Sequence, residues 1–480
     1  MSKNHIHILK HTASYIPSKL LVGINTLVIV PLYAHLLEVK EMSIYFIAIQ
    51  FLNIMCTVSS DWITKSILRF HEKFNIQNRI EDFYSNILSF SIFTQIIVML
   101  IYFSCSNLLQ LYLGVDFLTI ILSACLVIPS GIRQLLFQYL RVKDKSFLYT
   151  VSILFYQILN ILIFLILVKH VPNANSILIS MNIAMFIIDM YILNYIDFDI
   201  KPRFKFDIKI TKEIIQYASP LVITNICYWV IMHFSKLYFQ YKSIFLYTAI
   251  IGFFHLFTYN ILQPFASVFM FAGFPELVHK YEHNIPIKKY WTSIIQLYSV
   301  CILPIVMTFL YFHKEITSLF FPKEYLVGSI ILPLFAFSLF IHELIKLVNT
   351  KFHLKNKTNI EMIIALCSLS LLVAANIILM QRFSLFGAGL AFFISELFLL
   401  IFNTCIKIEN FEFLNYFSII KSIVIISLIG IFTYAIIIAP FIFISKTTVL
   451  SAGINITKII LFATIYYFIC YLFRNYILKT

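Results

Sequence analysis

The stretch FLYTVSILFYQILNILIFLILV, residues 147–168, carries no charged side chain. A run of about 20 apolar residues is what an α-helix needs to cross the hydrocarbon core of a bilayer. In lipid the backbone can satisfy its N–H and C=O groups only within a helix or a closed barrel, and the two-residue alternation of a barrel strand is absent here. This stretch therefore predicts a membrane-spanning helix.

Similar apolar windows recur along the chain and predict about fourteen transmembrane helices. They fall at 14–36, 43–63, 83–104, 115–137, 147–168, 174–196, 213–235, 244–270, 290–312, 325–348, 360–381, 384–405, 418–441 and 448–473. Hydrophobic residues make up 61% of the chain and charged residues 12%, and the mean hydropathy is +0.91. Because a water-soluble fold with this composition would lack polar surface, the sequence predicts an all-α polytopic membrane protein without a separate soluble domain.

Lysine and arginine are distributed unevenly between the two sets of connecting loops. With the N-terminus inside, 27 of the 36 basic residues fall on the inner side. The nine on the outer side are Lys40, Lys169, Lys236, Lys242, Lys314, Lys323, Arg382, Lys446 and Lys458. Because basic residues concentrate on the cytoplasmic side, this asymmetry predicts a multi-pass protein of the bacterial inner membrane with both termini in the cytoplasm. It also accounts for the net charge of +14 without a nucleic-acid partner.

A weak internal repeat suggests two halves. Residues 13–17 at the start of the first window and residues 218–220 at the start of the seventh both place Ala-Ser before a proline, and the densest basic loop, 197–212, separates the two halves. We expect a six-helix N-lobe over 1–200, a pseudo-symmetric six-helix C-lobe over 201–410, and two additional C-terminal helices over 411–480.

The most specific pattern lies in the first 80 residues. It consists of PLYAHLL at 31–37, Glu41, Tyr45, SDW at 60–62 and LRF at 68–70. These motifs resemble the polysaccharide transporter family of the multidrug/oligosaccharidyl-lipid/polysaccharide exporter superfamily, whose O-antigen flippases carry P-L-x-A-R-x-L, a following Tyr, and D-x-G before R-F. In this chain His35 replaces the Arg of that pattern, and Trp62-Ile63 replaces Phe-Gly.

The seventh window resembles the same family. YASPL at 217–221 stands at its start, whereas SKL at 235–237 stands where Asp-Arg-Leu is common in the family. Lys236 therefore lies in a segment that lacks the carboxylate of the family pattern.

The resemblance implies a flippase that moves an undecaprenyl-diphosphate-linked oligosaccharide, an O-antigen or capsule repeat unit, from the cytoplasmic to the periplasmic leaflet by alternating access. Its implied partners are this lipid-linked oligosaccharide, membrane lipids, and a polysaccharide polymerase with a chain-length regulator, in lipopolysaccharide or other polysaccharide biosynthesis. A diphosphate-sugar headgroup needs a polar cavity with cations to cross hydrocarbon. The eight cysteines show no metal-ligand spacing, and no cofactor is expected apart from H⁺ or Na⁺ coupling.

Three basic residues are candidates for binding the diphosphate. Lys19 lies about one turn inside the first window, Arg69 just beyond the second, and Arg133 about one turn from the inner end of the fourth. All three are expected at a similar cytoplasmic depth, and the alternative is that each side chain only extends to the interface. Asp61, eight residues before Arg69, is expected to have a structural role by pairing with a nearby cation.

Two carboxylates are expected deep in the membrane. Glu396 lies near the middle of the twelfth window and is the first candidate for ion coupling, and Asp189, in the sixth window, is the second. A packing or pairing role is the alternative for both. His342, Glu343 and Lys346, near the inner end of the tenth window, are expected to form an interfacial ion-paired cap.

Two prolines are candidate hinges. Pro17 and Pro220 occupy equivalent places at the starts of the first and seventh windows. A proline bends a membrane helix, so this placement would suit alternating access, although prolines are also common packing features of such helices.

Two other functions remain open. A multidrug or cation antiporter of the same superfamily would share the fold, but such proteins usually have twelve spans. A membrane polymerase or acyltransferase is the alternative from a different class. No nucleophile–base pair, metal-ligand set or phosphate-cradling glycine loop is evident among ten glycines in all, so the sequence predicts a transporter and not an enzyme.

Overall fold

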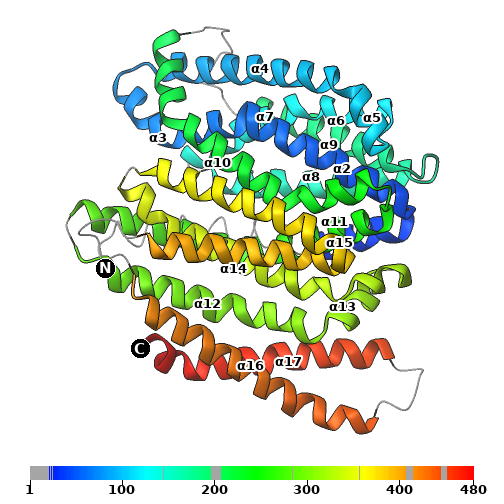
Figure 1. Cartoon of the computed structure of the whole chain (residues 1–480). Helices are drawn as coiled ribbons and strands as arrows, with labels where there is room; N and C mark the ends of the chain where they lie inside the picture. The colour runs from blue at the N-terminus through cyan, green and yellow to red at the C-terminus, as the bar shows by residue number, and fades with distance from the viewer. Residues whose placement is uncertain are drawn as a thin grey trace. The chain divides into compact units, whose positions relative to one another are not determined.

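The computed structural model describes residues 21, 23, 25–143, 145–195, 207–283, 285–355, 357–406, 414–444 and 451–479. These residues form two compact units. We call residues 28–252 the N-unit, and residues 25–27 together with the chain from 253 onward the C-unit. Every element in the described parts of both units is a helix, which confirms the all-α prediction (Figure 1).

A helical segment over Asn25–Leu36 begins in the C-unit and belongs to the N-unit from residue 28 onward. The elements that follow are α2 (Val39–Cys56), a π-helical turn η1 (Thr57–Asp61), α3 (Trp62–Ile76), α4 (Ile80–Ser104), α5 (Ser106–Leu113), α6 (Phe117–Cys125), α7 (Val127–Val142), α8 (Ser146–Leu167), α9 (Ala174–Tyr195) and α10 (Ile208–Tyr241). The stretch at 147–168 thus forms α8, which packs against α9.

The main part of the C-unit begins at residue 253, inside α11 (Phe245–Glu282). Its other elements are α12 (Lys288–Tyr311), α13 (His313–Phe320), a 3₁₀ turn η2 (Lys323–Gly328), α14 (Ile331–Leu354), α15 (Thr358–Cys405), α16 (Tyr416–Ile444) and α17 (Ser451–Lys479). α12 packs against α14, α16 and α17, and α14 packs along α15. Figure 1 shows α16 and α17 side by side with α12.

α15 consists of two helices joined by a sharp turn at Ser384, whose φ is 51°. Its halves correspond to the windows at 360–381 and 384–405. After the turn the chain comes back so closely that a Cβ on Gly387 would lie 2.1 Å from the carbonyl oxygen of Leu379. Only glycine fits that approach without a backbone shift.

Ten helices in the described residues are long and apolar enough to cross a membrane. One of them, Asn359–Cys405, covers two predicted spans because it includes the turn in α15. α10, α17 and Asn25–Leu36 also lie in predicted windows but are not among the ten. The chain is a multi-pass membrane protein, and the number fourteen stays a prediction.

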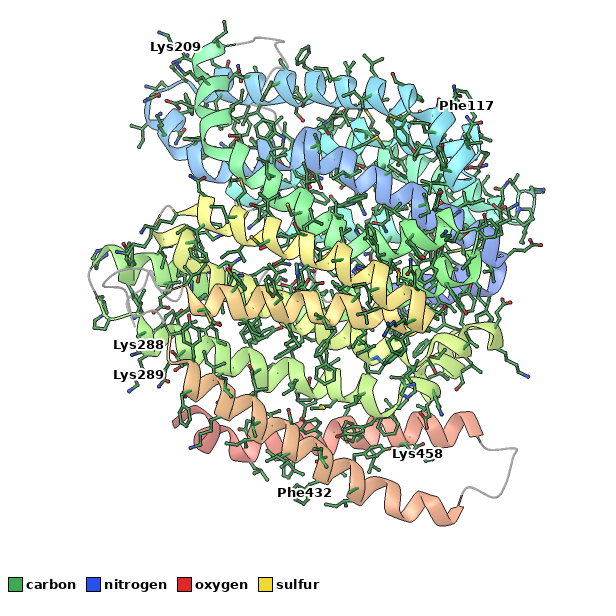
Figure 2. All side chains as sticks on the ribbon, in the orientation of Figure 1. Phe117, Lys209, Lys288, Lys289, Phe432 and Lys458 are labelled. Carbon is green, nitrogen blue, oxygen red and sulfur yellow. The ribbon has the colours of Figure 1, made fainter. Side chains whose placement is uncertain are left out.

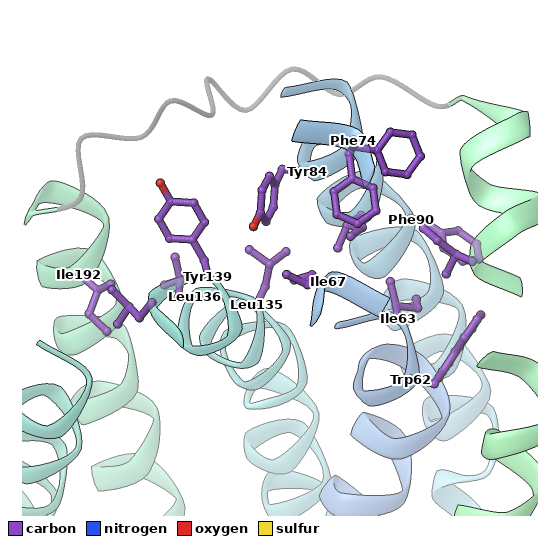
Figure 3. Close-up of a cluster of buried hydrophobic side chains, with 14 of the residues drawn as sticks. Trp62, Ile63, Ile67, Phe74, Tyr84, Phe90, Leu135, Leu136, Tyr139 and Ile192 are labelled. Atoms are coloured by element: carbon purple, nitrogen blue, oxygen red, sulfur yellow. The ribbon is translucent and has the colours of Figure 1, made fainter. Parts of the chain in front are cut away.

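A cluster of buried hydrophobic side chains holds α3, α4, α7 and α9 together in the N-unit. Trp62, Ile67, Phe90, Leu136 and Ile192 converge in this cluster (Figure 3). Burying such side chains against one another fixes the relative positions of the four helices. Two of these helices carry buried charged residues, Arg133 on α7 and Asp189 on α9.

α10 belongs to the N-unit, where it packs against α2, α3 and α4. Asp207 caps its first turn by accepting hydrogen bonds from the backbone N–H groups of Lys209 and Ile210, and Arg79 binds the same carboxylate at 2.8 Å. The N-unit therefore extends beyond residue 200, where the sequence places the end of the N-lobe. The three-part division into lobes stays a prediction.

Two labelled residues mark the two ends of the N-unit. Lys209, expected on the inner side, and Phe117, next to an outer loop, stand at opposite ends of this unit (Figure 2). In the C-unit, Lys288 and Lys289 lie together at one end (Figure 2). This arrangement is compatible with the distribution of basic residues in the sequence.

Candidate functional site: two buried charged pairs

Arg133 on α7 and Asp189 on α9 form a buried ion pair in the N-unit. The Nε of Arg133 donates to Oδ1 of Asp189 at 3.0 Å. Both residues are buried, with 8% and 4% of their surfaces exposed. The guanidinium carbon lies 4.1 Å from the ring centre of Tyr156 on α8, close enough for a cation–π contact.

The ion pair leaves hydrogen-bonding capacity unused. Within the described part of the chain, neither Nη2 of Arg133 nor Oδ2 of Asp189 has a hydrogen-bond partner, although both atoms are buried. A buried polar atom without a partner costs about 1–3 kcal/mol. One buried donor and one buried acceptor of this pair are therefore able to bind a further polar group.

A π-helical turn lies beside this pair. In η1 the carbonyl of Ser59 accepts a 2.6 Å hydrogen bond from Oγ1 of Thr94 on α4. Oγ of Ser60 donates to Oε1 of Gln134, which follows Arg133 on α7, at 3.4 Å. π-helical turns are rare and often occur at functional sites. This turn widens the helix and links the 60–62 motif to the helix that carries Arg133.

The C-unit has its own buried pair, Glu396 on the second half of α15 and His342 on α14. Nδ1 of His342 lies 3.2 Å and 3.3 Å from the two carboxylate oxygens of Glu396. Glu396 is fully buried and His342 is 4% exposed. Glu396, the first predicted candidate for ion coupling, thus lies against an imidazole in the interior of the C-unit.

A second charged pair lies one turn away on α14. Nζ of Lys346 donates to Oε1 of Glu343 at 2.6 Å. The hydroxyl of Tyr298 on α12 donates to the backbone carbonyl of Phe340, on the same stretch of α14. Glu343, His342, Lys346 and Glu396 together form a polar cluster, which we call the α14–α15 cluster, within an apolar bundle.

The structure brings together some of the residues predicted from the sequence. Arg133 and Asp189, which were predicted for separate roles, bind each other. Lys346 pairs with Glu343 as expected, but His342 faces Glu396 instead of an interface. The expectation for His342 was wrong because α14 extends to Leu354, beyond the predicted end at 348, which places His342 in the middle of the helix.

Other predicted residues are only partly described. Lys19 and Pro17 lie outside the described residues, and so do the side chains of Arg69 and Pro220. Their backbone lies in α3 and in α10, which is helical through position 220. The meeting of Lys19, Arg69 and Arg133 and the two hinges stay predictions.

Asp61 ends the π-helical turn. Its Oδ2 accepts a hydrogen bond from Oγ1 of Thr57 at 3.4 Å, within the turn itself. Its expected pairing with a cation stays a prediction.

Two features of the site were missed in the sequence. Tyr156 is one of 28 tyrosines and stands in no distinctive motif, so nothing local marks it as the partner of Arg133. The π-helical turn has no sequence signature either, although it overlaps the 60–62 motif. Within the described chain, no group of three or more His, Cys, Asp or Glu side chains is placed to hold a metal ion.

Comparisons with known proteins relate the chain to polysaccharide export. Residues 32–330 match the model of a family described as polysaccharide biosynthesis protein. No curated protein sequence matches the chain.

Among solved structures, the lipid II flippase MurJ in an inward closed conformation has a TM-score of 0.68 and 16% identity, covering 98% of this chain and 100% of its own. The eukaryotic MATE transporter AtDTX14 has a TM-score of 0.57 and 14% identity, covering 84% of this chain and 94% of its own. The MATE multidrug transporter DinF-BH has a TM-score of 0.60 and 14% identity, covering 82% of this chain and 94% of its own. The likeness shows a shared fold.

Proposed function

Because the chain belongs to the polysaccharide biosynthesis protein family, we propose that it is a flippase for an undecaprenyl-diphosphate-linked oligosaccharide. It would carry an O-antigen or capsule repeat unit from the cytoplasmic to the periplasmic leaflet of the inner membrane by alternating access. A diphosphate joined to sugars cannot cross hydrocarbon unaided, so the protein must offer it a polar path. The fold shared with a lipid II flippase supports this proposal.

The observation that carries the proposal is that Nη2 of the buried Arg133 has no hydrogen-bond partner among the described residues. A cation inside a membrane protein is costly, and such residues mark substrate and ion pathways. One nitrogen of Arg133 and one oxygen of Asp189 remain without partners in the described part of the chain, so the pair can accept a further polar group. In our proposal Nη2 of Arg133 binds a phosphate oxygen when the N-unit opens, and Asp189 keeps the guanidinium in place between substrates.

The Glu396–His342 pair supplies a second element of the proposal. Coupling of lipid movement to a proton gradient needs a group that gains or loses a proton between states. Protonation of this pair would change its charge and the contact between Glu396 on α15 and His342 on α14. In this way it would couple lipid movement to H⁺. The neighbouring Lys346–Glu343 pair lies within α14 and would stabilise that helix next to His342.

The antiporter alternative is less well supported. The MATE transporters share the fold, but the family model that matches this chain is one of polysaccharide biosynthesis. The membrane polymerase or acyltransferase alternative is further weakened because the similar solved structures are transporters. A polysaccharide polymerase and a chain-length regulator would act on the oligosaccharide after it has been moved.

Depletion of the protein in cells tests this function. Lipid-linked oligosaccharide should accumulate in the cytoplasmic leaflet, and surface polysaccharide should fall. The measurement is the fraction of this lipid that a glycosidase added to spheroplasts can digest. Full accessibility after depletion, together with normal polysaccharide, would show that another protein moves the lipid.

A further inference from the structure

A polar pocket lies in the N-unit between the end of α5 and the turn that joins α10 to α11. Its volume is about 410 Å³, within the range of about 300–1,000 Å³ typical of small-molecule sites. Tyr112, Gly114, Gln240, Tyr241, Lys242 and Ser243 line it. Both segments end on the side that the basic-residue distribution predicts to be periplasmic.

Backbone geometry fixes the two walls of this pocket. Gly114 ends α5 with φ 65°, and Ser243 turns the chain between α10 and α11 with φ 56°. Nε2 of Gln240 donates to the carbonyl of Leu113 at 2.7 Å, which ties one wall to the other. The Oε1 of Gln240 is buried and accepts no hydrogen bond from the described residues. The pocket thus has a fixed shape and an unused acceptor at its wall.

Two tyrosines supply an aromatic surface. The ring centres of Tyr112 and Tyr241 are 6.0 Å apart with an interplanar angle of 35°. The two residues are 51% and 53% exposed. Rings that are half exposed at a polar pocket can stack on the apolar face of a sugar, while their hydroxyls and the Ser243 hydroxyl bind sugar hydroxyls.

Positive charge gathers at this pocket. Nζ of Lys242 lies 5.6 Å from the ring centre of Tyr241, and Nζ of Lys40 lies 5.8 Å from that of Phe245, which also lines the pocket. None of the lining residues is acidic. Two of the nine cations predicted on the outer side, Lys40 and Lys242, thus lie on or beside this pocket.

We propose that this pocket binds an acidic saccharide of one or two sugar units. The tyrosines bind the ring faces, Gln240 and Ser243 bind hydroxyls, and Lys242 binds the carboxylate with support from Lys40. The inference rests on the proposed function, because a flipped lipid would present its sugars on this side. The site would receive the saccharide after the diphosphate has passed.

Saccharide binding to the purified full chain in detergent tests this proposal. The probes are digalacturonic acid and the neutral disaccharide N,N′-diacetylchitobiose, measured by saturation-transfer NMR. Tyr241→Ala should weaken binding of digalacturonic acid about tenfold, and Lys242→Gln should remove the preference for it over the neutral probe. Tyr191→Ala, which alters a tyrosine of similar exposure on α9, should bind like the wild type.

Two results would contradict saccharide binding at this pocket. One is that the wild type does not bind digalacturonic acid. The other is that the wild type, Tyr241→Ala and Tyr191→Ala bind it equally. The same proteins are assayed for flipping in proteoliposomes, which separates this inference from the proposed function. Flipping without saccharide binding would refute the pocket alone, and binding without flipping would refute the flippase alone.

Discussion

Single and double substitutions of Arg133 and Asp189 can separate the contribution of this ion pair to stability from its contribution to lipid flipping. Removing one partner of a buried ion pair leaves the other charge uncompensated and costs about 3–5 kcal/mol, whereas replacing both by apolar residues is often neutral. We predict that Asp189→Leu lowers the melting temperature of the purified protein. Adding Arg133→Met to it should restore that temperature but leave lipid flipping impaired, because no cation remains for the phosphate.

Arg382→Ala is the control for this pair, since it removes an exposed arginine and should leave both melting and flipping unchanged. Melting is followed by size-exclusion chromatography after heating, and flipping is followed in proteoliposomes. If the double variant recovered flipping along with stability, the pair would be structural and Arg133 would not bind substrate.

Glu396 is the residue on which gradient dependence is expected to rest. Gln keeps the shape and hydrogen-bonding capacity of Glu but cannot change its charge. Glu396→Gln should therefore remain folded and inserted while its flipping no longer responds to a proton gradient, and Glu396→Asp should keep part of the response. Proteoliposomes with and without an imposed proton gradient provide the measurement. A wild-type response in the Gln variant would assign Glu396 to packing against His342.

Among the elements, the turn within α15 has the strictest steric requirement for a particular residue, the glycine at position 387. A Cβ at Gly387 would lie 2.1 Å from a backbone oxygen, whereas a Cβ at Gly389 would lie 3.0 Å from the side-chain Cδ1 of Leu334. Gly387→Ala should thus destabilise the protein by about 1–3 kcal/mol, and Gly389→Ala by less. The yield of monodisperse protein after heating compares the two. Equal yields would contradict the close approach of Gly387 to the Leu379 carbonyl.

The helices could be predicted from the sequence much better than their side-chain partners. A long apolar run in lipid has only the helix available to it, so the window at 147–168 differs from α8 by one residue at each end. The break between 381 and 384 likewise matches the turn at Ser384. The Arg133–Asp189 pair was not predictable, because the two residues are 56 positions apart and meet only through the packing of α7 on α9.

At the scale of the whole molecule, the distribution of basic residues predicts which side each loop faces. Both termini should be cytoplasmic and the 107–116 connection periplasmic. Ser2→Cys and Asn107→Cys, each in a background that lacks the eight native cysteines, test this with a membrane-impermeant maleimide added to intact spheroplasts. Only the Asn107→Cys protein should be labelled. Labelling of Ser2→Cys from outside would reverse the topology, and with it the side assigned to the saccharide pocket.

Lipid movement by the purified protein tests the central claim most directly. Proteoliposomes are loaded with an undecaprenyl-diphosphate-linked oligosaccharide that carries a radiolabelled sugar, and an external glycosidase reports the accessible fraction over time. We predict that this fraction rises from about half, the share in the outer leaflet of a symmetric vesicle, towards completion with the wild type, and much more slowly with Arg133→Met/Asp189→Leu. A fraction that stays at the level of protein-free vesicles with well-folded wild-type protein would contradict the account.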